Sequence, residues 1–283
     1  MLKNNPNITS ILNKDFITSL KRTSFIQKID NSGHLVIDYN PDKIPFSSSM
    51  IDLLVDRKFL KNRIRLDRLH DYLSLEDMKV DKNQINNVIK SFYDTNKSMQ
   101  NLYQKLMSEI IVNHIGQNAY IQKTPTNRFS FPFSKGMSYR DYHIDIMLGH
   151  PPEEINVWVP FTNSSLTKSF KILPLDYSLE LLSKYNYDMQ VIHFEIWNND
   201  KLFESLEKNS IFVELSPGKA LLFDSRCFHA SVMNESNYTR VSMDVRIIPE
   251  RDYDNLPFTY IGTGRRKSQF IAGDYYSKTK VEL

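Results

Sequence analysis

The stretch Arg240-Val-Ser-Met-Asp-Val-Arg-Ile247 decides the fold class, because polar and apolar residues alternate strictly along it. Side chains of a β-strand point alternately to its two faces. One face therefore carries Arg240, Ser242, Asp244 and Arg246, and the other carries Val241, Met243, Val245 and Ile247. If this strand belongs to a barrel, its apolar face packs outward beneath helices and its charged face points into a cavity.

The two arginines of this strand need anionic partners if they are buried, and a planar guanidinium matches a carboxylate at two points. For Arg240 we expect the carboxylate of a ligand. For Arg246 we favour pairing within the chain, with Asp244 or Asp224.

A turn and a buried strand precede this stretch, in Ser216-Pro-Gly-Lys-Ala-Leu-Leu-Phe-Asp224. The segment Cys227-Phe-His229-Ala-Ser231 follows closely, so His229 is predicted to lie where a new strand begins after a loop. Cys227 is the single cysteine, which excludes an internal disulfide framework and a thiolate zinc cluster. We interpret it as a small, buried, apolar residue.

A candidate metal site lies upstream, in Tyr139-Arg-Asp-Tyr-His-Ile-Asp145. On a strand, His143 and Asp145 point to the same face, and one more histidine would complete a 2-His-1-carboxylate triad with open iron positions. We expect His229 to be that histidine. The segment His193-Phe-Glu195 has the same spacing, but too few residues separate it from His229 to hold several whole strands. The alternative for His143 is a hydrogen-bonded core histidine beside a capping or turn aspartate.

The rest of the chain predicts one mainly β domain with packed helices. Apolar residues at helical spacing between residues 47 and 110 predict helices on the outside of a sheet: Met50, Leu53, Leu54, Phe59, Ile85, Val88, Ile89, Phe92, Met99, Leu102, Leu106 and Ile110. Short β-branched and aromatic runs predict strands at 35–39, 119–123, 127–131, 139–147, 155–161, 170–173, 189–196, 211–215, 220–223, 228–232 and 239–248. Segments 176–187 and 199–208 fit short helices or loops. These elements favour a β-sandwich or barrel.

Composition narrows the function classes. The chain has 283 residues, 41% of them hydrophobic, and a formal net charge of +3. It has no concentrated Lys/Arg stripe, and we interpret Gly264-Arg-Arg-Lys267 as a solvated loop, so nucleic acid is not an expected partner. The first thirty residues lack an apolar signal segment, and no run is long enough for a membrane span. We expect a cytoplasmic monomer or homodimer acting on a small molecule.

Four segments, in this order and spacing, resemble one known family. They are His143-Ile-Asp145, Ile155-Asn-Val-Trp-Val-Pro-Phe161, Lys168-Ser-Phe-Lys-Ile-Leu-Pro174, and His229-Ala-Ser231 with Arg240. The chain is similar to the phytanoyl-CoA-dioxygenase-like branch of the iron(II)- and 2-oxoglutarate-dependent oxygenases. In detail it resembles small bacterial members from carbohydrate and aminoglycoside biosynthesis clusters, such as that for streptomycin. The resemblance runs from about Ile121 to Pro249.

The resemblance implies a double-stranded β-helix, a jelly-roll or cupin-like barrel with the N-terminal helices outside. Residues 1–117 would give mostly helical support, 118–250 the barrel core and 251–283 a C-terminal extension. It implies that iron(II) is held by His143, Asp145 and His229, and that Arg240 with Ser231 receives the distal carboxylate of 2-oxoglutarate.

Further contacts follow from the same resemblance and from strand alternation. Trp158 corresponds to an aromatic beside the cosubstrate, with ordinary core packing as the alternative. Asn156 shares its strand face, so its amide is placed to reach 2-oxoglutarate or the substrate. Where relatives carry Pro-Gly-Ser-His, this chain has Pro174-Leu-Asp-Tyr-Ser178, so their substrate contacts do not carry over there.

The resemblance implies hydroxylation of an unactivated C–H bond of a small molecule. Iron(II), 2-oxoglutarate and dioxygen would take part, with release of succinate and CO2. Because Asp145 fills the third ligand position, a halide has no vacant site, and hydroxylation, desaturation or ring closure is favoured over halogenation. Substrate contacts are candidates only at Arg128, Tyr139, Arg140, Tyr142 and Arg246, each of which also fits an ordinary surface or packing residue.

Two other functions fit the same residues. One is a cupin-like binding module that recognises a small anionic ligand or sugar without turnover and without a required metal. The other is a metal-dependent hydrolase or isomerase on a β-barrel, in which Arg240 would contact the substrate. Binding of iron(II) followed by 2-oxoglutarate would favour the oxygenase over both of these alternatives.

Overall fold

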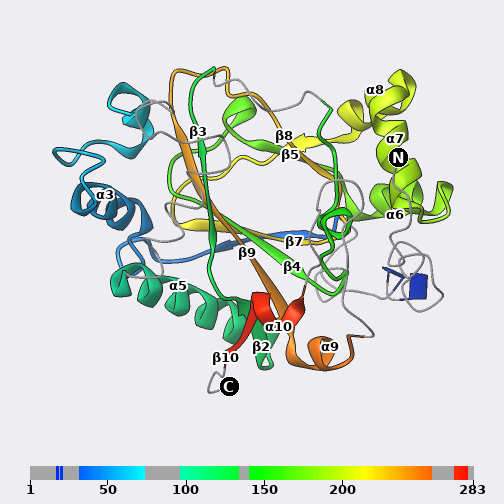
Figure 1. Cartoon of the computed structure of the whole chain (residues 1–283), viewed down its shortest axis with the longest axis horizontal. Coiled ribbons are helices and arrows are strands. Elements are labelled where there is room, and N and C mark those ends of the chain that lie inside the picture. Colours follow the sequence, from blue (N-terminus) through cyan, green and yellow to red (C-terminus); the bar gives the residue numbers. More distant parts are fainter. Residues whose placement is uncertain are drawn as a thin grey trace.

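The computed structural model describes residues 17–18, 20–21, 32–73, 96–133, 140–256 and 271–279. These residues form two antiparallel sheets with helices packed around them (Figure 1). The predicted class, mainly β with packed helices, is confirmed at this level.

The larger sheet has seven strands, and the long strand β9 lies at its centre. Its path is β1 (His34–Asp38), β7 (Lys219–Asp224), β4 (Ile155–Pro160), β9 (Arg240–Pro249), β2 (Ala119–Gln122) and β10 (Tyr276–Thr279), and β3 (Thr126–Ser130) also pairs with β9. All of these pairs are antiparallel. β9 thus pairs directly with β2, β3 and β4.

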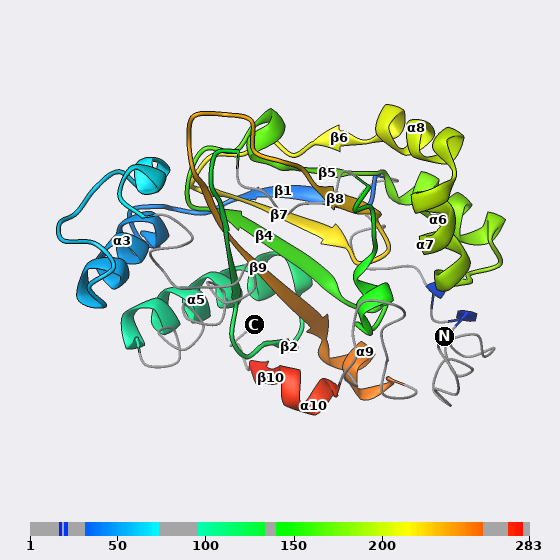
Figure 2. The ribbon, with the colours of Figure 1, turned by 45° about the horizontal axis from the view of Figure 1, so that its top comes forward.

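One face of this sheet is covered by helices, as the alternation along β9 predicts (Figure 2). The apolar residues of β9 join the same core as α3 (Phe46–Asp56) and α5 (Lys97–Ile110). Asn96 caps α5 by accepting a hydrogen bond from the Met99 amide, and a π-helical turn, Ile111–Ile115, extends the helix. The 3-10 helix η2 (Leu66–Asp71) contributes two buried leucines. The expected stripe at residues 85–92 lies outside the described residues.

The smaller sheet comprises β6 (Ile211–Phe212), β5 (Phe170–Ile172) and β8 (His229–Ser231). Three helices connect β5 to β6: α6 (Leu175–Lys184), α7 (Met189–Asn198) and α8 (Asp200–Asn209). They bury leucines, isoleucines and aromatics in a second core. The other short helices in the described part of the chain are η4 (Asp145–Leu148), η5 (Leu166–Lys168), α9 (Glu250–Asp254) and α10 (Ala272–Tyr275).

Two predicted strands are wrong. Residues 189–196 form α7, in which Asp188 caps the amides of Gln190 and Val191 and the buried residues recur at helical spacing. Residues 139–147 do not form a regular strand, because only an isolated antiparallel bridge joins His143 to His229 before the chain turns into η4. The bridge nevertheless brings these two distant segments side by side.

In the part of the chain that the structure describes, no helix is long and apolar enough to cross a membrane.

Candidate metal and cosubstrate site

Two histidines and one aspartate meet at one end of the space between the sheets. The backbones of His143 and His229 exchange hydrogen bonds of 3.0 and 2.9 Å, which sets their rings 4.5 Å apart, centre to centre. Oδ1 of Asp145 lies 3.8 Å from Nε2 of His229, and the potential ligand atoms of all three residues lie within 4.8 Å of one another. The predicted triad therefore converges.

The backbone fixes which imidazole nitrogen each histidine presents. Nδ1 of His143 lies 2.8 Å from the carbonyl oxygen of Asp141, and Nδ1 of His229 lies 3.1 Å from that of Cys227. A carbonyl only accepts hydrogen bonds, so in the neutral ring Nδ1 carries the proton and Nε2 carries the lone pair. Both histidines are thus held in the tautomer that binds a metal through Nε2.

Electrostatics keep His143 and Asp145 in the protonation states that a metal requires. Burial lowers the pKa of His143 to about 3, and the neighbouring His229 adds to this effect. Although burial alone would raise the pKa of Asp145, the guanidinium of Arg246 holds it well below its usual range. A neutral imidazole and a carboxylate are therefore available at neutral pH.

Arg246 contacts the aspartate of this triad. Its Nε and Nη2 lie 3.1 and 2.7 Å from Oδ2 of Asp145. The expected partners of Arg246 were Asp244 and Asp224, and both are engaged elsewhere: Asp244 with Arg128, and Asp224 with Arg226. The prediction that Arg246 pairs within the chain is confirmed, but the predicted partners were wrong, because the partner is Asp145.

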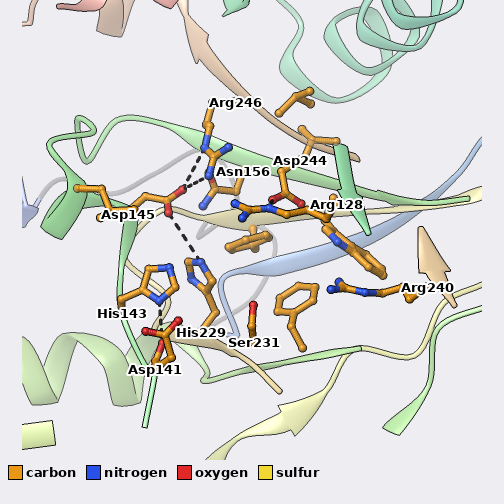
Figure 3. A pocket seen from close by; sticks show the side chains of 16 residues that line it. Arg128, Asp141, His143, Asp145, Asn156, His229, Ser231, Arg240, Asp244 and Arg246 are labelled. Atoms are coloured by element: carbon orange, nitrogen blue, oxygen red, sulfur yellow. Dashed lines mark hydrogen bonds and ion pairs between the residues drawn. The ribbon is translucent and has the colours of Figure 1, made fainter. Parts of the chain in front are cut away.

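A cavity of about 190 Å³ extends from the triad between the two sheets (Figure 3). Its wall draws on β3, β4, β7 and β9 of the larger sheet, on β5 and β8 of the smaller one, and on residues 141–148. It is lined by Arg128, Asp141, His143, Asp145, Leu148, Asn156, Val157, Trp158, Phe170, Phe223, His229, Ser231, Arg240, Asp244, Val245 and Arg246. The charged face of β9 looks into this cavity, as predicted.

Arg240 lies at the side of the cavity away from the triad, with its guanidinium directed inward (Figure 3). It is 3% exposed, and its Nε has no hydrogen-bond partner among the described residues. Burial lowers its pKa to about 10, which still leaves it charged at neutral pH. Asp244, four residues further along the same strand face, pairs with Arg128 at 2.6 Å. A buried cation at the cavity wall is the feature expected of a carboxylate-binding position.

Three other predicted cosubstrate residues also line the cavity: Ser231, Trp158 and Asn156. The Trp158 ring packs edge-on against Phe170, with centroids 5.1 Å apart. Both amide atoms of Asn156 are buried and have no hydrogen-bond partner in the described ranges. An amide in this state is suited to a polar ligand group.

The candidate substrate residues separate into two groups. Arg128 lines the cavity and is partly exposed. Tyr142 points away, since its hydroxyl lies 2.7 Å from both Glu207 and Ser210 under the helices, which corrects its prediction as a substrate contact. Arg140 pairs with Asp200 and does not line the cavity, and Tyr139 lies outside the described residues.

The competing pair His193 and Glu195 takes no part in this site. His193 is on α7, away from the cavity. Cys227 is fully buried, and burial raises the pKa of its thiol well above the usual value.

Sequence reasoning missed Asp141, Phe170 and Phe223 as residues that line the cavity. Only Asp141 left a signal, since it precedes His143 by the same two-residue spacing as separates His143 from Asp145.

Comparison with known proteins gives a distant relative. No protein-family model matches the chain. It is 24% identical over 166 residues to the streptomycin biosynthesis protein StrG of Streptomyces griseus, which covers 58% of this chain and 64% of StrG. The chain thus aligns with slightly less than two thirds of that relative's length.

Several solved structures share the fold. The carbocyclase SnoK from nogalamycin biosynthesis, described as α-ketoglutarate dependent, matches with a TM-score of 0.52 and 10% identity over 93% of this chain and 98% of SnoK. EctD from S. alaskensis, in its apo form, matches with a TM-score of 0.52 and 14% identity, over 85% of this chain and 80% of EctD. EctD with 2-oxoglutarate and 5-hydroxyectoine matches with a TM-score of 0.50 and 14% identity, over 87% of this chain and 84% of EctD. The predicted resemblance is therefore confirmed for the fold.

Proposed function

We propose that this chain is an iron(II)- and 2-oxoglutarate-dependent dioxygenase of the phytanoyl-CoA-dioxygenase-like group that hydroxylates an unactivated C–H bond of a small molecule. One observation carries this proposal. His143, Asp145 and His229 converge at one end of a cavity whose wall also holds the buried cation Arg240. Two imidazoles and one carboxylate are the donor set that non-heme iron(II) oxygenases use.

The cavity polar groups match the remaining demands of such a reaction. Arg240 and the hydroxyl of Ser231 would receive the distal carboxylate of 2-oxoglutarate, and Asn156 its iron-proximal end or the substrate. Trp158 would exclude water along the cosubstrate's methylene chain. When bound, iron supplies the oxidising chemistry that consumes 2-oxoglutarate and dioxygen and releases succinate and CO2. The protein contributes placement and a dry cavity.

The finer architecture belongs to the same proposal. A cavity between two antiparallel sheets, with helices outside and with likeness to SnoK and EctD, supports a double-stranded β-helix. The whole chain would form a single oxygenase domain, with helical support in 1–117, the barrel core in 118–250 and an extension in 251–283. A cytoplasmic monomer or homodimer stays a prediction.

The substrate class follows from the cavity and the relatives. StrG and SnoK come from streptomycin and nogalamycin biosynthesis, and one EctD structure holds 2-oxoglutarate and 5-hydroxyectoine. We propose a sugar-, amino-acid- or natural-product-like substrate. Its entry would pass Arg128, the partly exposed cation at the cavity.

Anaerobic titration tests the function. Iron(II) is added first, then 2-oxoglutarate, and a weak visible charge-transfer band is expected in the wild-type protein. The band should vanish in His143→Ala and persist in the control His193→Ala, which removes a histidine from α7, outside the cavity. No band in folded, iron-loaded wild type would contradict the oxygenase and favour a cupin-like binding protein. Succinate release over a panel of nucleotide sugars, aminoglycoside precursors, amino acids and acyl thioesters then identifies the substrate.

A further inference from the structure

Arg246 lies behind the metal site and contacts one of its ligands. It is buried on β9 opposite Asn156, and both its Nε and Nη2 donate to a single oxygen of Asp145, Oδ2. The other oxygen, Oδ1, faces Nε2 of His229 at 3.8 Å. The two oxygens of this carboxylate therefore have different surroundings: one is held by the guanidinium and the other faces the two imidazoles.

The pairing is specific, because other acids near Arg246 have partners of their own. Asp244, two residues earlier on the same strand face, accepts from Arg128 at 2.6 Å. Glu154, fully buried, places Oε1 2.8 Å from Nδ1 of His150. Arg246 and Asp145 are 101 positions apart in the chain, so the contact comes from the tertiary fold and not from local geometry.

The number of oxygens that Asp145 offers decides how many positions remain on the metal. A carboxylate binds a metal through one oxygen or through both. With one oxygen and two imidazoles, an octahedral ion keeps three positions, which a chelating cosubstrate and dioxygen can fill. With both oxygens bound, only two positions remain, one fewer than the reaction needs.

The geometry points to Arg246 as a positioning residue that holds Asp145 as a single-oxygen ligand and so preserves the third open position. The two donor contacts to Oδ2 engage this oxygen and orient Oδ1 toward the imidazoles. The inference rests on the proposed function only for the presence of a metal at the triad. It concerns how Asp145 binds, and it does not depend on which substrate is oxidised.

Counting metal-bound water tests this role without turnover. The protein is loaded with manganese(II) in the absence of 2-oxoglutarate, and broadening of the electron paramagnetic resonance lines in ¹⁷O-enriched water gives the number of bound waters. We expect three waters in the wild type, because three protein ligands occupy an octahedral ion. We expect two in Arg246→Met, because the released Oδ2 also binds the metal.

Matched variants separate positioning from a loss of charge or of packing. Arg128→Met removes another cavity arginine that pairs with an acid outside the triad, and it should keep three waters. Arg246→Lys keeps a cation near Oδ2 and should restore the third water at least in part. Arg246→Gln, too short to reach Asp145, should give two waters and serves in place of Arg246→Met if that variant does not fold.

Three results would overturn the inference. Three waters in both Arg246→Met and Arg246→Gln would show that Asp145 binds through one oxygen without help. Three waters together with a loss of 2-oxoglutarate affinity in these variants would make Arg246 a cosubstrate contact instead. A wild-type protein that binds neither manganese(II) nor iron(II) would remove the metal site itself, and with it the proposed function. Only this third result affects both proposals.

Discussion

Two arginines six positions apart on the same face of β9 have opposite environments. Arg246 is buried against Asp145, and although burial alone would lower its pKa, this carboxylate raises it well above the usual value. Arg240 is buried to a similar degree, but its pKa is lowered to about 10 by burial and its Nε has no partner among the described residues. One strand face thus carries one cation that the fold neutralises and one that it leaves incompletely satisfied.

The difference separates a structural charge from a binding charge. A buried charge without a partner costs stability, and a folded protein tolerates this cost where a ligand supplies the missing group. The Arg246 end of the face therefore belongs to the metal ligands, and the Arg240 end belongs to the cosubstrate. Each of the predictions below changes one side of this comparison.

The largest effect is expected at the metal end. His229→Ala removes one of the three ligands and should lower succinate formation by on the order of 10³-fold or more, because the metal contributes several kcal/mol to such a reaction. Metal content, measured on the same samples, should fall in parallel. His193→Ala should retain both, and equal losses in the two variants would show that the effect does not come from the triad.

Removing Arg246 should destabilise the metal-free protein. Arg246→Met leaves the Asp145 carboxylate buried without its cation, and breaking a buried ion pair in this way costs about 3–5 kcal/mol. Urea unfolding in the presence of a chelator measures this loss. Metal loading should recover part of it, because the metal then neutralises the carboxylate. An unchanged unfolding midpoint would show that the pair adds nothing to stability.

Removing Arg240 should have the opposite effect on stability. Arg240→Met eliminates an incompletely paired buried charge, so the metal-free protein should unfold at a higher urea concentration than the wild type. Its affinity for 2-oxoglutarate should fall by about 30- to 5 × 10³-fold, which corresponds to the ~2–5 kcal/mol lost when one member of a buried charge pair is truncated. Titration of the charge-transfer band measures this change. An unchanged affinity would remove Arg240 from the cosubstrate site.

The same comparison shows what sequence could predict. The orientation of the two faces of β9, charged toward the cavity and apolar toward the helices, was predictable. Alternation is a local property of the sequence, and β9 is regular over ten residues. The convergence of His143, Asp145 and His229 was predictable from donor chemistry and strand count. The partner of Arg246 was not, because Asp145 reaches it through a bend into η4, where period-two reasoning no longer applies.

The failure at residues 189–196 has a different physical reason. A short apolar run fits a buried strand and one side of a helix equally well. Asp188, which accepts hydrogen bonds from two amides at the start of α7, was a local start signal that outweighs the β-branched residues after it. The buried positions Met189, Ile192 and Ile196 then follow helical spacing.

The smallest effect is expected at Glu154, which is paired less completely than Arg246 and more completely than Arg240. Its Oε1 contacts His150, whereas its Oε2 has no hydrogen-bond partner in the described residues. Burial raises the pKa of Glu154 above its usual value of 4.5, although His150 and Arg246 oppose this shift. The folded state therefore favours the protonated form. The associated stability is fully present below pH 4.5 and is lost as the pH rises through the raised pKa.

Glu154→Gln keeps the size of the side chain and removes its ionisation, so its stability relative to the wild type should increase as the pH rises from about 4.5 to 8. We expect a gain of about 1 kcal/mol at the upper end, the size of one buried hydrogen bond. Urea unfolding of both proteins across this range measures the difference, with Glu207→Gln as a carboxylate control away from the cavity. If the free energies of unfolding of the two proteins changed with pH in parallel, His150 would neutralise Glu154 as completely as Asp145 neutralises Arg246. Arg240 would then differ from both as the incompletely paired buried charge.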